Sequence, residues 1–162
     1  MTLKELVHRI EACASDQPSI NMIVRNDIFK LNTVQDAKYG AFGCMQQVHT
    51  EDISTDSVAY SFVFYYVDRL NEDKSNEVEV QSVALTTLSN IIRKLAEYDV
   101  EADTWNYQTF NQRFHDECAG AFCNVTLYAP VTISCEEDYD LSGSYNESYD
   151  DDFDINRPLR TI

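Results

Sequence analysis

The sequence predicts an α+β domain: a mostly antiparallel β-sheet with an N-terminal helix and one long central helix packed on it, followed by an extended acidic C-terminal arm. Three observations predict this class. Segments with helical periodicity alternate with segments rich in aromatic and β-branched residues. The links between the expected strands are short, and the C-terminal stretch has few aliphatic side chains. We therefore expect a folded domain over residues 1–134 and an arm over residues 135–162.

The N-terminal helix is predicted from its apolar spacing and its cap. Apolar residues recur at helical spacing from Leu3 to Ala14. Thr2, followed three residues later by Glu5, has the capping-box pattern that starts a helix. The polar residues at 15–18, which include a proline, end it.

Two short apolar runs and a longer strand are expected next. Residues 22–24 and 28–31 fit edge strands or an extended loop. Residues 39–48 read as a strand in which Gly40 and Gly43 mark a bulge.

The central strand is predicted over residues 59–67, which are dense in aromatic and β-branched side chains. It is expected to pair antiparallel with the strand before it. Bulky side chains point to both sides, so we expect both faces to be covered, by other elements or by a neighbouring subunit.

A long helix follows over residues 78–96. Asn76 and Glu79 stand in capping-box positions. The face expected to pack on the sheet consists of Ala84, Leu88, Ile91 and Leu95.

The last strands are predicted after a polar connector at 98–104. Residues 105–114 and 121–128 alternate as strands do, Gly120 breaks the pattern, and Pro130 ends it.

Charge is unevenly distributed along the chain. There are 28 acidic and 12 basic residues, for a net charge of −16. Nine of the acids lie within 135–154 without a lysine or arginine, which leaves 19 acids against 12 bases elsewhere. This balance disfavours nucleic acid as a direct ligand, because phosphate contacts need cations. The arm alone buries too little apolar surface to fold.

The number of cysteines and the hydropathy of the chain indicate the cellular compartment. Five cysteines, an odd number, contain no CxxC spacing and indicate a reducing compartment. We expect no signal peptide and no membrane span, because no apolar run approaches the roughly 18 residues that a span needs.

The candidate chemical motifs are weak. His115 and Cys118 could act as base and nucleophile, but adjacent strand residues alternate in direction, and a polar strand end is the favoured interpretation. The carboxylates of 150–154 could bind Ca²⁺, but they lack the EF-hand spacing, which favours a solvated acidic arm. A zinc site is disfavoured by the spacing of Cys118 and Cys123. We therefore expect no enzyme, no cofactor and no metal.

Four segments together carry a resemblance to a known family. They are YYVDRL at 65–70, Asn76 in the link after it, VEVQS at 78–82 and TFNQRFHDECAGAFCNVTL at 109–127, ahead of an acidic tail. Their order resembles the small neck proteins of tailed bacteriophages, namely the tail-terminator, tail-completion and head–tail connector ring proteins, including ring proteins of crAss-like phages. The resemblance spans roughly residues 1–130, so the first domain looks tail-terminator-like.

The resemblance implies a structural, non-enzymatic virion protein that is assembled in the bacterial host cytoplasm. Subunits of such proteins form homo-oligomeric rings, six-membered for terminators and twelve-membered for portal-attached rings. The implied partners are further copies of the chain, the portal and other neck or tail proteins. DNA passes through the ring without specific binding, and no membrane is involved.

Candidate subunit-interface residues follow from the abundance of aromatics, which suits lateral contacts. The alternative is that these aromatics fill the core of one monomer. At the end of the central strand, Asp68 and Arg69 fit an ion pair, a lateral contact or a solvated turn. The candidates are Tyr65, Tyr66, Asp68, Arg69, Tyr139, Tyr145, Tyr149 and Phe153.

Two other functions remain open from the sequence. An acidic inhibitor that mimics DNA on a host nuclease or polymerase would explain the net charge of −16. The concentration of acids in one terminal arm counts against it, since a duplex mimic spreads carboxylates over its folded surface. An enzyme that uses His115 and Cys118 is the weakest alternative.

Overall fold

The computed structural model describes residues 1–25, 38–47, 57–103, 105–111 and 117–130. These lie in one compact unit, Met1–Thr132. Within the described ranges, no helix has the length and apolar character needed to cross a membrane. The elements in chain order are α1 (Leu3–Ser15), β1 (Met22–Arg25), β2 (Ala41–Gln46), β3 (Ser57–Arg69), α2 (Glu77–Leu95), the 3-10 turn η2 (Ala96–Tyr98), β4 (Glu101–Ala102), β5 (Asn106–Asn111) and β6 (Cys118–Pro130).

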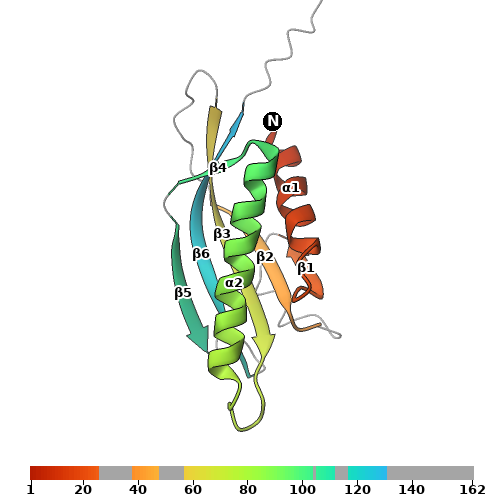
Figure 1. The fold of residues 1–162 in the computed structure, drawn as a ribbon, viewed down its shortest axis with the longest axis vertical. Helices are drawn as coiled ribbons and strands as arrows, with labels where there is room; N and C mark the ends of the chain where they lie inside the picture. The colour runs from red at the N-terminus through yellow and green to blue at the C-terminus, as the bar shows by residue number, and fades with distance from the viewer. Residues whose placement is uncertain (26–37, 48–56, 104, 112–116, 131–162) are drawn as a thin grey trace, which may run out of the picture. The chain divides into compact units, whose positions relative to one another are not determined.

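One six-stranded sheet has the order β1-β2-β3-β6-β4, and β5 also pairs with β6. β1 pairs with β2 in parallel, and the other pairs are antiparallel. Both helices lie on the same face of the sheet, and β1 and β5 lie at opposite sides (Figure 1). The predicted α+β class and mostly antiparallel sheet are confirmed. The parallel pair was not predicted, because side-chain alternation carries no information about strand direction.

The two central strands, β3 and β6, are longer than the sequence indicates. Each has 13 residues, and they stay in register from Ser57 opposite Pro130 to Arg69 opposite Cys118. The ladder extends over polar and small end residues, whose backbones pair regardless of their side chains.

The predicted break at Gly120 is wrong. Gly120 lies inside β6, opposite Val67 on one side and Phe110 on the other. A Cβ atom at this position would lie 1.9 Å from the carbonyl oxygen of Tyr66. The glycine therefore permits a close approach of two backbones instead of ending the strand.

The predicted bulge in the second strand is not found either. Gly43 keeps ladder register, opposite Tyr65. Gly40 precedes β2 with a φ of 76°, a left-handed conformation that glycine adopts at little cost. The other predicted short run, 28–31, lies outside the described residues.

The two helices begin differently. In α1 the capping box is confirmed: the Glu5 N–H donates to Thr2 Oγ1 at 3.2 Å, and the Thr2 N–H donates to Glu5 Oε2 at 2.7 Å. The capping box predicted for α2 is wrong, because Asn76 makes no side-chain cap. Its amide instead accepts from the Asn71 N–H at 2.8 Å and donates to the Arg69 carbonyl at 3.2 Å, which closes the turn after β3.

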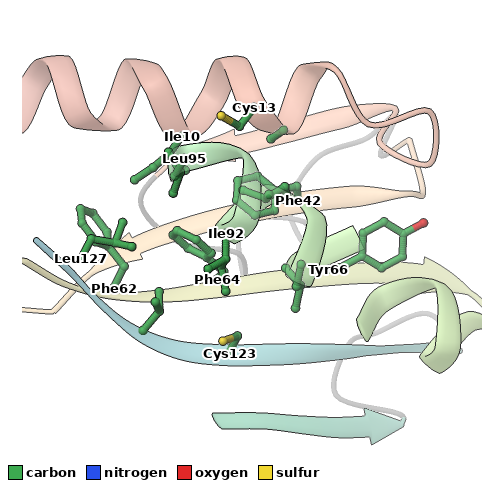
Figure 2. Close-up of a cluster of buried hydrophobic side chains, with 14 of the residues drawn as sticks. Ile10, Cys13, Phe42, Phe62, Phe64, Tyr66, Ile92, Leu95, Cys123 and Leu127 are labelled. Carbon is green, nitrogen blue, oxygen red and sulfur yellow. The ribbon is translucent and has the colours of Figure 1, made fainter. Parts of the chain in front are cut away.

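The main core lies between the helices and one sheet face (Figure 2). The predicted face of α2 is confirmed, since Ala84, Leu88, Ile91 and Leu95 are fully buried. Phe42 and Phe64 meet edge to face at a centroid distance of 5.6 Å. A smaller buried cluster on the opposite sheet face contains Val24, Ala41, Val67, Phe110 and Cys118.

Candidate subunit interface

Tyr66 does not fit its predicted interface role. Its side chain is 1% exposed and belongs to the main core, so it cannot contact a second subunit (Figure 2). Its hydroxyl donates to the Ser19 carbonyl at 3.1 Å and lies 3.4 Å from Asp68 Oδ2. Burial, reinforced by the Asp68 charge, raises the pKa of Tyr66 to about 12. For this residue, the monomer-core alternative holds.

The other described candidates make contacts within the monomer. Tyr65 is partly buried and packs on Phe122 at a centroid distance of 5.8 Å. Asp68 accepts the Arg69 N–H at 2.7 Å. The Arg69 guanidinium lies 5.7 Å from the centre of the Tyr39 ring, within cation–π range. Their surfaces remain partly accessible, so the interface role of Tyr65, Asp68 and Arg69 stays a prediction.

Several predicted residues lie outside the described ranges. They are the four arm aromatics Tyr139, Tyr145, Tyr149 and Phe153, the carboxylates of 150–154, and His115.

A surface groove lies between α1 and the β1–β2 edge, with a volume of about 490 Å³. Its walls are mostly apolar and its rim carries two permanent cations, Lys4 and Arg25, against one carboxylate, Glu11. We call it the basic groove. Its lining residues are Leu3, Lys4, Val7, His8, Glu11, Ile23, Val24, Arg25 and Cys44.

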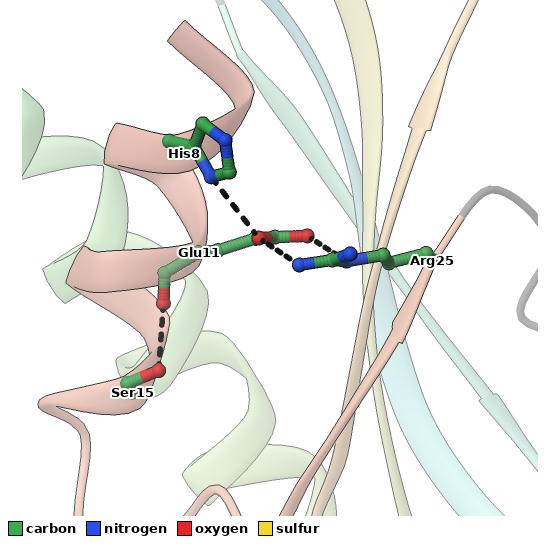
Figure 3. Close-up of polar contacts among 4 residues, drawn as sticks. All are labelled: His8, Glu11, Ser15 and Arg25. Atoms are coloured by element: carbon green, nitrogen blue, oxygen red, sulfur yellow. Dashed lines mark hydrogen bonds and ion pairs between the residues drawn. The ribbon is translucent and has the colours of Figure 1, made fainter. Parts of the chain in front are cut away.

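A bidentate ion pair forms part of the lining of the basic groove. Arg25 donates through Nε to Glu11 Oε1 at 2.7 Å and through Nη2 to Glu11 Oε2 at 2.9 Å (Figure 3). His8 Nδ1 approaches the same carboxylate at 3.8 Å. Hydrogen bonding to Glu11 raises the pKa of Arg25. The pair ties α1 to β1 and neutralises Glu11, which leaves Lys4 as the unbalanced charge.

Cys44 lies in the wall of the basic groove. Burial, with a smaller effect of the Glu11 charge, raises the pKa of its thiol to about 12. The thiol is thus protonated at neutral pH and behaves as an apolar side chain.

The opposite edge of the sheet, at β4, carries negative charge instead. Three exposed carboxylates, Asp99, Glu101 and Asp103, follow one another around β4. Trp105 comes next and is 41% exposed, one of three large hydrophobic side chains found exposed among the described residues. We call these four residues the acidic edge.

Backbone bonds fix the acidic edge. Asp99 has a φ of 58°, and its N–H donates to the Ala96 carbonyl at 3.3 Å. The Asp103 N–H donates to the Thr126 carbonyl at 3.0 Å, which holds the chain against β6. A pocket of about 590 Å³ opens beneath Trp105 and the end of α2, and Arg93 is the one cation that lines it. The acidic edge is thus held in place by backbone hydrogen bonds and carries a net negative charge.

The described residues offer few candidates for a catalytic or metal-binding site. In these ranges, no group of three histidine, cysteine or acidic side chains is arranged to hold a metal ion. Cys118, proposed above as a nucleophile in the weakest alternative, is fully buried in β6.

The basic groove and the acidic edge were both missed in the sequence. Residues 98–104 read as a polar connector, although Glu101 and Ala102 form β4 against Tyr128 and Leu127. A signal was present in the spacing of Asp99, Glu101 and Asp103 just before the single tryptophan. Nothing in the spacing shows that Lys4 and Arg25 line the same groove, because that depends on α1 packing beside β1.

No protein-family model matches this sequence, and the search of curated proteins gave no match.

Proposed function

We propose that this chain is the subunit of a homo-oligomeric ring in the neck of a tailed bacteriophage. The ring connects the portal to the tail or terminates the tail tube, and its partners are other copies, the portal and neighbouring neck proteins. It resides in the virion, and DNA passes through it without specific binding.

The pair of unlike lateral edges is the observation that carries this proposal. A ring subunit needs two different surfaces that meet head to tail. The basic groove at β1 and the acidic edge at β4 stand at opposite ends of the strand order, and their charges are opposite. The sequence resemblance to neck proteins adds the setting in which such a ring acts.

The mass of the purified full-length protein tests the proposal. Light scattering after size exclusion should give six or twelve times the 18.6 kDa subunit mass, and electron microscopy should show rings. Because a ring can need a template, the protein is also co-expressed with the products of the genes that flank it. A monomer or a closed dimer under both conditions contradicts the proposal. A monomer that inhibits a nuclease would support the DNA-mimic alternative.

A further inference from the structure

We infer that the lateral contact of the assembly places Trp105 of one copy in the basic groove of the next, with the carboxylates of the acidic edge against the groove cations. This inference deepens the proposed ring function and rests on it. It names the two surfaces that meet and the residue that anchors them.

The shapes of the two surfaces suit this contact. Trp105 is exposed although it is a large apolar side chain, and such residues commonly anchor interfaces. The basic groove, at about 490 Å³, falls within the roughly 300–1,000 Å³ of pockets that bury drug-sized ligands, so it accepts an indole ring. Leu3, Val7 and Ile23 supply the apolar walls.

The charges of the two surfaces also suit this contact. Glu101 and Asp103 closely precede Trp105 in the chain and are exposed, whereas Lys4 and His8 lie one helical turn apart on the exposed side of α1. Two acidic edges repel each other, and so do two basic grooves. The contact therefore favours head-to-tail over two-fold pairing. A head-to-tail contact either closes into a ring or continues as a filament.

The alternative occupants of the groove are chemically distinct. The acidic arm of a neighbouring copy also carries carboxylates and aromatics. If the arm fills the groove, its removal would abolish assembly while substitutions at the acidic edge would not.

Charge reversal of one surface at a time tests the inference on the full-length chain. The edge variant is Glu101→Lys with Asp103→Lys, and the groove variant is Lys4→Glu with His8→Glu. Both leave the Glu11–Arg25 pair in place. The control variant, Glu72→Lys with Glu79→Lys, reverses two exposed carboxylates near the start of α2, which lies a helix length from the acidic edge.

Each reversed variant alone should lose the ring peak, whereas their equimolar mixture should restore it, because every edge then meets a groove of opposite charge. The restored ring alternates the two variants, which six or twelve positions allow. Trp105→Ser should lower the assembled fraction at least about tenfold, as expected for an anchor residue. Far-UV circular dichroism confirms that each variant is folded, and the control should assemble like the wild type.

Two outcomes would overturn the inference. The reversed variants could assemble as the wild type does, or the mixture could fail to restore the ring. In both cases the wild type still forms a ring and the proposed function stands. If the wild type never assembles, the proposed function and the inference fall together.

Discussion

At Gly120 the backbones of two neighbouring strands approach closely. It lies between Val67 of β3 and Phe110 of β5, and the space that a side chain needs is occupied by the Tyr66 carbonyl at 1.9 Å and the Phe110 ring at 3.0 Å. A backbone atom in the middle of a ladder cannot move aside without breaking its neighbours' hydrogen bonds.

Gly120→Ala should therefore lower the free energy of unfolding by about 1–3 kcal/mol or more, the usual cost of overpacking. A urea titration measures the change. Ser82→Ala, on the exposed side of α2, is the control and should stay within about 0.5 kcal/mol. An equally small change for Gly120→Ala would show that the strands separate freely at this position.

Two thiols and one phenol with raised pKa values are expected to set the alkaline limit of stability. Burial raises the pKa of Cys44 and Cys123 from 9.0 to about 12, and that of Tyr66 from 10.0 to about 12. Because each folded-state pKa is raised, the stability that each group contributes is complete below about pH 9 and is lost as the pH rises toward 12.

The unfolding free energy should thus fall between pH 9 and 12, with each group adding at most about 1.4 kcal/mol per pH unit. In the double variant Cys44→Ala with Cys123→Ala, the decline should be shallower, although the variant is less stable at pH 7. A decline as steep as that of the wild type would show that other groups cause it.

At the scale of elements, α2 joins the two halves of the sheet. It runs from the turn after β3 to the acidic edge, and its apolar face lies on β3 and β6 in the main core. Acidic residues in its first turn and Arg93 and Lys94 in its last complement the helix dipole. Lys94 also pairs with Asp16 at the end of α1, which connects the two helices.

Leu88→Ala should cost about 2–5 kcal/mol, because the leucine is fully buried and its removal leaves a cavity. Val78→Ala on the same helix is the matched control, since Val78 is 79% exposed. Chemical denaturation measures both. A loss below about 0.5 kcal/mol at Leu88 would contradict its place in the core.

The elements with the strongest periodicity were the ones the sequence predicted well. The face of α2 and the inward residues Cys123, Val125 and Leu127 of β6 follow from spacing alone. The hydrogen bonds of Asn76 do not follow from spacing. Its side-chain amide can bond either to the start of the helix or to the preceding turn, and only the folded chain determines which partners it meets. The two-residue β4 has too few positions to show an alternation.

The proposed interface was the least predictable feature. The abundance of aromatic residues suggested Tyr65 and Tyr66 as interface residues. Such abundance indicates that side chains are buried, but not whether the monomer core or a partner subunit buries them. The basic groove and the acidic edge depend on the strand order, which brings β1 and β4 to opposite ends. Strand order is a property of the whole fold and not of any local pattern.

At the scale of the whole molecule, the charge is divided between a mildly acidic body and a strongly acidic arm. Nine acids without a base over residues 135–154 repel one another, and four aromatics recur among them. Such a segment can lie along a neighbouring subunit and add to a sheet edge. We expect the arm to act as a tether between subunits or between rings.

Deletion of residues 135–162 should leave the domain folded, with an unchanged circular dichroism spectrum, but should prevent it from joining the assembled neck particle. Co-purification with the neck proteins measures this step, and the full chain is the control. Assembly of the truncated chain at the level of the full chain would contradict the tether.

An electron-microscopy reconstruction of the assembled oligomer decides whether the subunits form a head-to-tail ring. We predict a closed ring of six or twelve copies in which the β4 side of each subunit, with Trp105, faces the α1–β1 side of the next. A two-fold dimer that pairs like edges, or a chain that stays monomeric beside its neck partners, would contradict it.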